Sequence, residues 1–181
     1  VKNVPDLNIP IDQTREGIVS ETLKPLLKLR LKMKADMQDL DPNSIEYQTT
    51  KAESTALKWL LVVCFGYQGY NRFKLGRIEA HETVTAISRW ILQITSDTAY
   101  ELGFEVLHMY VDGLWLRKSD GSKASDFEIG ELLKTIENKT GLPISVEENY
   151  KWIAFLSSRE DERNSVPNRY FGEKSDGSFK V

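Results

Sequence analysis

Two β-rich runs joined by a two-residue turn constrain the fold of this chain more than any other feature. Residues 104–111 and 114–118 are dominated by aliphatic, aromatic and β-branched side chains, and only Asp112-Gly113 separates them. Asp-Gly between two such runs is the strongest short-range signal for a β-hairpin. A helical pattern over residues 80–102, closed by a glycine, stands directly before the first run. The sequence therefore predicts a long helix followed by an antiparallel hairpin.

The remainder of the second half mixes helix and strand signals. Residues 127–139 form another helical pattern, which Gly141 closes. Four short β-rich runs also occur: residues 144–150, 152–157, 169–172 and 178–181. We therefore expect an α+β chain in which residues 66–181 form an antiparallel sheet flanked by helices.

Residues 20–65 predict an antiparallel helical hairpin. Residues 27–34 alternate strictly, as a strand would, but they are good helix formers and none is β-branched. A turn signal at residues 41–44 interrupts the helical pattern, which then resumes. Residues 1–19 show no sustained period and are expected to be an extended lead-in. The first residue is Val rather than Met, which suggests an excised segment.

Composition narrows the class of protein. Of 181 residues, 28% are charged and 40% hydrophobic, with a formal net charge of -3, which suits compact folded domains. A single cysteine, Cys64, and two histidines, His81 and His108, exclude an internal disulfide and a Cys/His zinc cluster. No apolar run approaches the ~20 residues of a membrane helix, and no signal peptide is recognisable. We expect a cytoplasmic protein without membrane contact.

Cations gather on the predicted helical hairpin. Positions 22–35 contain no acidic residue and five cations: Lys24, Lys28, Arg30, Lys32 and Lys34. On the second helix, Lys51 and Lys58 are seven residues apart and so share one face. Two helices that turn cations toward one groove can hold a triphosphate. The same residues are also typical of a solvated surface, and residue type alone leaves both interpretations open.

Residues 65–74 interleave four aromatic side chains and two glycines with two cations. Nucleic-acid surfaces show this mixture, because rings stack on bases and cations contact phosphates. A bent strand that packs its rings in a core is the alternative. No G-x-x-x-x-G-K-[ST] order is present, which excludes a Walker phosphate loop. By residue type alone, Asp112 is an ordinary turn residue and His108 an ordinary strand residue.

The order and spacing of these features resemble the fingers and palm of family B DNA polymerases, particularly the archaeal members. The resemblance covers all but the lead-in. Family members carry K-x-x-x-N-S-x-Y-G on the second fingers helix. This chain keeps Lys58, an aromatic at Phe65 and a glycine at Gly66, but has Val62 and Val63 in place of Asn-Ser.

Two further family motifs are partly retained. The Y-x-D-T-D-[SG] hairpin keeps its second acid as Asp112 and has Tyr110 in place of the first. The K-x-Y motif beside the primer terminus resembles Asn168-Arg169-Tyr170, which keeps the ring and offers Arg169 as a cation. The resemblance implies that Arg169 and Tyr170 contact primer-template DNA.

The resemblance also implies roles for the other matched residues. Arg30 and Lys58 would contact the incoming deoxynucleoside triphosphate (dNTP), and Phe65 would pack near the nascent base pair. Asp112 would be the catalytic carboxylate that binds Mg²⁺, the cofactor of the parent enzyme.

The expected function is part of a template-directed DNA polymerase, which transfers a nucleotide from dNTP to a primer 3'-OH. Residues 20–65 would be the fingers and residues 66–181 the palm. The reaction needs two metal ions bridged by carboxylates from two strands. The other family acid lies in D-x-x-S-L-Y-P, which does not occur here, so the fragment by itself is expected to be inactive.

Two alternatives stay open at this point. Tyr110, Val62, Val63 and Asn168 each replace a family residue, which is compatible with a catalytically degenerate, polymerase-derived DNA-binding accessory protein of replication. An unrelated α+β protein-interaction domain, whose basic helix is merely solvated, is the second.

Overall fold

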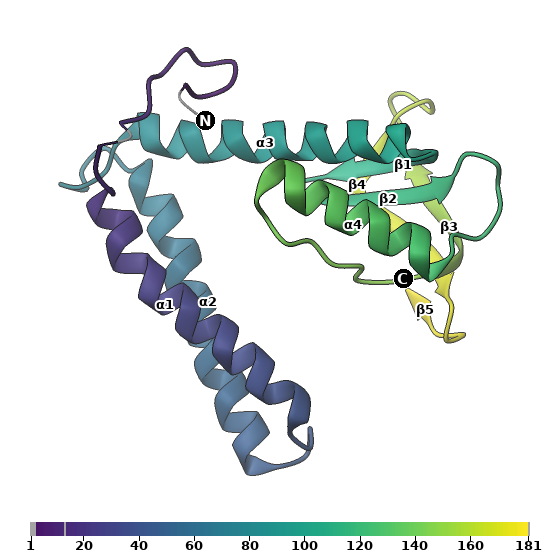
Figure 1. The fold of residues 1–181 in the computed structure, drawn as a ribbon, viewed down its shortest axis with the longest axis horizontal. Helices are drawn as coiled ribbons and strands as arrows, with labels where there is room; N and C mark the ends of the chain where they lie inside the picture. The colour runs from purple at the N-terminus through teal and green to yellow at the C-terminus, as the bar shows by residue number, and fades with distance from the viewer. Residues whose placement is uncertain (1–2, 13, 181) are drawn as a thin grey trace. The chain divides into compact units, whose positions relative to one another are not determined.

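The computed structural model describes residues 3–12 and 14–180 and divides into two compact units (Figure 1). The first unit is Val1–Ile87 and the second is Ser88–Val181, so the division falls within a long helix. The first unit contains a pair of helices, and the second contains two small antiparallel sheets. This mixture confirms the α+β prediction.

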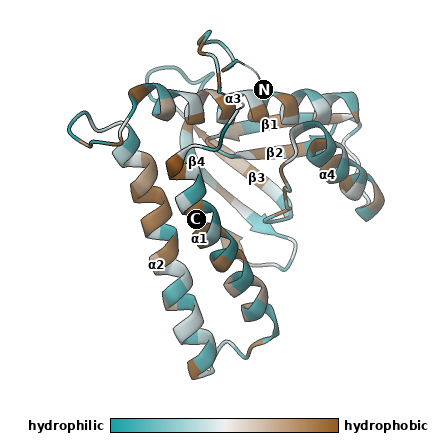
Figure 2. Cartoon of the chain, turned by 60° about the vertical axis from the view of Figure 1, so that its left-hand side comes forward, coloured by the Kyte–Doolittle hydropathy of each residue, from teal (hydrophilic) through white to brown (hydrophobic). Residues whose placement is uncertain are grey.

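The first unit is built on two antiparallel helices that lie side by side (Figures 1 and 2). Helix α1 spans Ile18–Asp36, the 3-10 turn η1 spans Met37–Asp39, and α2 spans Ile45–Gln68. The Ser44 hydroxyl caps α2 by accepting a hydrogen bond from the Tyr47 backbone N–H at 3.1 Å. Such a cap satisfies a backbone donor that has no partner within the helix. The helical-hairpin prediction is therefore confirmed.

Few side chains of this helical pair are buried. Helix α1 has no fully buried residue, and Ser54 is buried on α2. The second half of α2 is largely hydrophobic in Figure 2, although many of its apolar side chains are exposed. Within the described residues, no helix combines the length and apolarity needed to cross a membrane. The exposed apolar side chains of the pair are Ile18, Leu27, Leu29, Leu31, Ile45, Trp59, Leu60, Val62, Val63 and Tyr67.

The segment after α2 is a wound turn and not a strand. Helix α2 ends at Gln68, and α3 begins at Ile78 and runs to Glu101 (Ile78–Glu101). Between them, the Phe73 N–H donates to the Tyr70 carbonyl at 3.0 Å and the Gly76 N–H donates to the Phe73 carbonyl at 2.8 Å. The bent core strand considered for residues 65–74 is therefore wrong, because this backbone satisfies its hydrogen bonds locally.

The lead-in folds back on itself. The Val4 N–H donates to the Ile9 carbonyl at 2.8 Å, and Asn3 forms a β-bridge with Pro10. Val4 is buried, at 2% exposure. The expected extended segment is thus a small turn anchored by one apolar side chain, with residues 1, 2 and 13 outside the described residues.

The second unit contains the predicted hairpin, with helices packed on it. Strand β1 (Phe104–Tyr110) pairs antiparallel with β2 (Gly113–Lys118), and helix α4 spans Asp126–Thr140. An isolated two-stranded hairpin is marginally stable in water, so helix packing is needed to hold it. The buried cluster that joins α3, β1 and α4 is Ala99, Phe104, Leu132 and Ile136.

The remaining strands form a separate antiparallel sheet in the order β3-β4-β5. They span Tyr150–Ser157, Ser165–Lys174 and Phe179–Lys180. The strand expected at 144–150 is wrong except at its last residue, since Ile144 packs against the buried helix–hairpin cluster instead of pairing with a strand. The last residue of the run expected at 178–181 lies outside the described residues.

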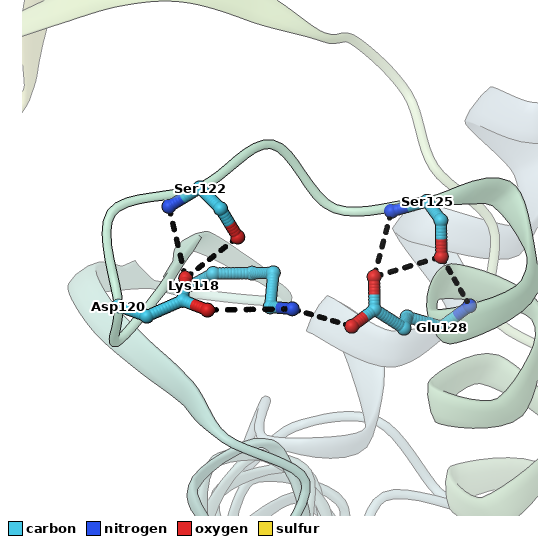
Figure 3. A network of polar contacts seen from close by, with 5 residues as sticks. All are labelled: Lys118, Asp120, Ser122, Ser125 and Glu128. Carbon is cyan, nitrogen blue, oxygen red and sulfur yellow. Dashed lines mark hydrogen bonds and ion pairs between the residues drawn. The ribbon is translucent and has the colours of Figure 1, made fainter.

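A polar network joins the end of β2 to the start of α4 (Figure 3). The Lys118 ammonium donates a short hydrogen bond to the Glu128 carboxylate and lies 3.7 Å from Asp120 Oδ2. The Glu128 N–H donates to Ser125 Oγ at 3.3 Å, and the Ser125 N–H donates to Glu128 Oε2 at 2.8 Å. Such a capping box typically contributes about 1 kcal/mol. The hydrogen bond from Lys118, followed by those from Ser125, lowers the pKa of Glu128 to about 2.

We expect Glu128→Gln to destabilise the protein at neutral pH and to weaken its sensitivity to acid. A carboxyl whose pKa is lower in the folded state contributes stability above its ordinary value of 4.5, and this contribution is lost as pH falls toward 2. Urea unfolding midpoints from neutral pH down to that value measure the effect. Glu131→Gln, on an exposed position of the same helix outside the network, is the control. Equal midpoints for the two variants at neutral pH would contradict the prediction.

Candidate functional site

The turn between β1 and β2 presents Asp112 to solvent. Tyr110 pairs with Gly113, so Val111 and Asp112 alone form the turn, and both are exposed. Val111 has φ 54°, in the left-handed region that β-branched residues rarely adopt. This conformation costs of order 1–2 kcal/mol for a residue with a Cβ. Strain of this kind is concentrated at functional sites, which makes this turn the first candidate.

Asp112 is one carboxylate and does not complete a metal site. Carboxylate oxygens are ligands that Mg²⁺ prefers, and Asp112 offers them at an exposed tip. Within residues 3–12 and 14–180, however, no three His, Cys, Asp or Glu side chains gather closely enough to hold a metal ion. Tyr110 places a phenol where the family motif carries its first acid. At this turn the described residues therefore offer a single carboxylate, Asp112.

His108 joins the hairpin to the second sheet. Its Nδ1 lies 3.1 Å from Ser165 Oγ at the start of β4, and its ring centroid lies 4.7 Å from that of Phe155. Its Nε2 is buried and has no hydrogen-bond partner in the described part of the chain. Trp115 of β2 completes the contact, with its ring 5.1 Å from that of Tyr170. An aromatic cluster thus fixes the Asp112 hairpin against β3 and β4.

The structure brings Arg30 and Lys58 to the same stretch of the helical pair. Arg30 is half-buried, and its Nε donates to the Ser54 carbonyl oxygen at 3.3 Å. Ser54 and Lys58 are four residues apart and therefore lie on one face of α2. Lys51, the third cation of this surface, lies 5.7 Å from the centre of the Tyr47 ring. Arg30 thus contacts α2 one helical turn before Lys58.

Phe65 is stacked on His81. The two ring centroids are 4.3 Å apart with an interplanar angle of 20°, and His81 Nδ1 lies 3.2 Å from the Phe65 carbonyl oxygen. A Cβ at Gly69 would approach the His81 ring to 3.2 Å, so the glycine leaves room for the imidazole. One face of the Phe65 ring is covered in this way.

Arg169 and Tyr170 are consecutive on β4, so their side chains point to opposite faces of the sheet. The Tyr170 ring packs against Trp115 and Phe155. Burial, followed by a hydrogen bond to Tyr170, raises the pKa of Tyr150 to about 12. Arg169 is exposed and forms no ion pair within the described residues. Of the two residues expected at DNA, Tyr170 is therefore packed against other rings, and Arg169 is exposed without an ion-pair partner among the described residues.

The predicted site residues divide between the two units. The sequence did not predict two contacts near these residues, that of His81 with Phe65 and that of His108 with Ser165. These pairs are separated by 16 and 57 positions, and no local pattern marks such partners. Arg30, Lys58 and Phe65 belong to the first unit, and Asp112, Arg169 and Tyr170 belong to the second.

Among known proteins, archaeal family B DNA polymerases are similar to this chain in both sequence and fold. No family model matches the sequence. The family B DNA polymerase of the hyperthermophilic archaeon Pyrobaculum calidifontis matches the structure with a TM-score of 0.69 and 26% identity, over 98% of this chain and 21% of that one.

Two curated relatives show the extent of the match. DNA polymerase 2 of Saccharolobus solfataricus is 31% identical over 155 residues, which are 86% of this chain and 21% of the relative. DNA polymerase 2 of Aeropyrum pernix is 26% identical over 181 residues, 100% of this chain and 21% of the relative. The chain spans about one fifth of the length of these relatives. It is homologous to part of the archaeal family B DNA polymerases, which excludes an unrelated interaction domain.

We expect Val111→Asn to stabilise the protein by about 1 kcal/mol, because Asn tolerates the left-handed region better than a β-branched residue. Urea unfolding of the variant and the parent sequence measures the change. Val146→Asn is the control, since Val146 is also exposed and has no positive φ. An equal gain in stability at both positions would mean that the gain does not come from the backbone conformation of Val111. A loss of stability in Val111→Asn would contradict the proposed strain at this turn.

Proposed function

We propose that this chain provides the fingers and palm of a template-directed DNA polymerase, with residues 20–65 as fingers and residues 66–181 as palm. The observation that carries the proposal is the Asp112 hairpin in a chain homologous to DNA polymerases along its length. In the reaction, the primer 3'-oxygen bonds to the α-phosphorus of dNTP, pyrophosphate leaves, and the hydroxyl proton is lost.

The helical pair would bind the incoming nucleotide. Lys58 is exposed on α2, and Arg30 donates a hydrogen bond to the carbonyl of Ser54, one turn earlier on the same helix. Hydrogen bonds between cationic side chains and phosphate oxygens are about twice as strong as neutral ones. Phe65, stacked on one side against His81, would pack near the nascent base pair.

The second unit would hold metal and DNA. Asp112 would be the catalytic carboxylate and would supply one ligand to Mg²⁺ in the parent enzyme. Arg169 would contact a phosphate of primer-template DNA, and Tyr170, fixed in the aromatic cluster, would position that strand. The remaining metal ligands would come from outside the described residues, which is why we propose that the fragment alone is inactive.

A second candidate is a catalytically degenerate DNA-binding accessory protein of replication. The observation in its favour is the combination of Tyr110 at a family acid position with a single carboxylate at the turn. The two candidates agree on DNA binding and differ in catalysis. Primer extension by the complete protein separates them, since only the polymerase elongates a primer.

Asp112→Asn should reduce primer extension by the complete protein about a hundredfold or more, because it removes a negatively charged metal ligand from the reacting centre. Affinity for primer-template DNA, measured without dNTP, should stay within about twofold of the parent sequence. Asp126→Asn, on α4, is the matched control and should extend normally. Extension that survives Asp112→Asn removes the catalytic role, and a parent protein that binds DNA without extension supports the degenerate candidate.

Lys58→Ala should raise the KM for dNTP about ten- to a hundredfold, as expected for a lost charge-assisted hydrogen bond. The comparison is Lys134→Ala, an exposed lysine of α4 outside the proposed nucleotide site. Steady-state incorporation of a single nucleotide at varied dNTP concentration measures both variants. An unchanged KM in Lys58→Ala would remove the triphosphate role from this residue.

A further inference from the structure

A β-bulge interrupts the pairing of β1 with β2. The register is regular from Phe104 to Val106 and shifts before His108, which pairs with Trp115. Leu107 is therefore an extra residue without a partner on β2. Successive side chains of a strand point to opposite faces, so one extra residue reverses the faces of the residues that follow it.

The bulge turns His108 away from the helices. Phe104 belongs to the buried cluster shared with α3 and α4, and Val106 packs against that cluster. In a regular strand His108, two residues after Val106, would face the same helices. Its ring lies instead 4.7 Å from that of Phe155 on β3. Bulges that re-aim a side chain in this way often occur beside active sites.

His108 supplies the hydrogen bond between the two sheets. Aromatic packing makes the rest of this contact, with Trp115 of the hairpin against Phe155 and Tyr170. His108 Nδ1 lies 3.1 Å from Oγ of Ser165, the first residue of β4. Among the described residues, no other hydrogen bond or ion pair joins β1 or β2 to β3, β4 or β5. Apolar burial is non-directional, whereas a hydrogen bond fixes a distance and an angle.

The second ring nitrogen of His108 shows that this residue is not the most stable choice for its position. Nε2 is buried and has no hydrogen-bond partner among the described residues. A buried polar atom without a partner costs stability. A phenyl ring would fill the same aromatic surroundings without that cost. An unpaired group of this kind in a packed position points to a role other than packing.

The hydrogen bond joins the two strands that carry the proposed reaction. Asp112 follows His108 by four residues, at the hairpin turn, and Arg169 follows Ser165 by four residues, on β4. Asp112 would hold metal at the reacting centre, and Arg169 would hold primer-template DNA. Misplacement of reacting groups by about 1 Å can cost about a hundredfold in rate. The position of the hairpin on the second sheet therefore matters for the reaction.

We propose that His108 is a positioning residue, which fixes the Asp112 turn relative to the DNA-binding segment of β4 through its hydrogen bond with Ser165. The inference deepens the proposed function and rests on it for the reaction. His108 acts through the placement of Asp112 and contacts neither metal nor substrate itself.

The first test separates rate from stability. His108→Phe keeps a ring and removes the unpaired Nε2, so its urea unfolding midpoint should equal or exceed that of the parent sequence. The single-turnover rate of primer extension by the complete protein, at saturating dNTP, should nevertheless fall about tenfold. The dNTP concentration that gives half the maximal rate should stay within about twofold, because the first unit would bind the nucleotide. A rate that falls only together with the unfolding midpoint would assign His108 to packing and overturn the inference.

Ser165 provides matched variants. Ser165→Ala should lower the same rate about tenfold, and Ser165→Thr, which keeps the hydroxyl, should extend at close to the parent rate. Ser157→Ala is the control, since Ser157 is exposed and pairs with Ser165 across the sheet. The double variant His108→Phe/Ser165→Ala should be no slower than either single variant, because both changes remove one hydrogen bond. A parent-like rate in Ser165→Ala, or additive losses in the double variant, would overturn the inference.

Amide hydrogen exchange tests the placement without DNA, dNTP or metal. Ser165→Ala should accelerate exchange at residues 108–115 of the complete protein about fivefold, as expected when one hydrogen bond no longer holds the segment. Ser157→Ala should leave it unchanged. If the complete protein never extends a primer, the proposed function fails and exchange decides the inference: acceleration supports His108 as the residue that places the hairpin. Parent-like exchange in Ser165→Ala overturns the inference whether or not primers are extended.

Discussion

Burial of four side chains at the helix–hairpin contact is the interaction on which the second unit depends. Ala99 from α3, Phe104 from β1, and Leu132 and Ile136 from α4 form one apolar cluster. A two-stranded hairpin has too little pairing of its own to persist in water. The hairpin is held on the side that faces the helices by this cluster, and at the end of β2 by the hydrogen bond from Lys118 to Glu128. These contacts can stabilise the hairpin against the strain of Val111 in its turn.

The first unit depends on a different kind of contact. Its helices bury few side chains, and a charged group spans them, since Arg30 donates to a backbone carbonyl of α2. The Arg30 guanidinium has five N–H donors, and this contact with α2 uses the one on Nε. Near the end of α2, Phe65 stacks on His81 of α3. Side chains expected at the nucleotide therefore also stabilise the unit.

Much of this arrangement could be predicted from the sequence. Asp112-Gly113 between two β-rich runs predicted the hairpin, although the turn itself is Val111-Asp112, one residue earlier, because Gly113 pairs with Tyr110. The turn signal at residues 41–44 predicted the helical pair. The prediction of a strand at residues 144–150 was wrong, because Ile144 packs against the buried cluster of the second unit instead of pairing with another strand. The segment 65–74 was ambiguous, since aromatics and glycines suit a bent strand or a wound turn equally until hydrogen bonds are known. Long-range contacts of His81 and His108 left no local signal.

The sequence by itself determined the order of elements, the position of the acid at the hairpin turn and the family resemblance, because these depend on residue type and spacing along the chain. Only the tertiary structure decided which side chains meet. It placed Arg30 beside the face of α2 that carries Lys58, covered Phe65 with His81, and turned Arg169 and Tyr170 to opposite faces. Such contacts join distant positions through packing, and packing is a property of the whole fold.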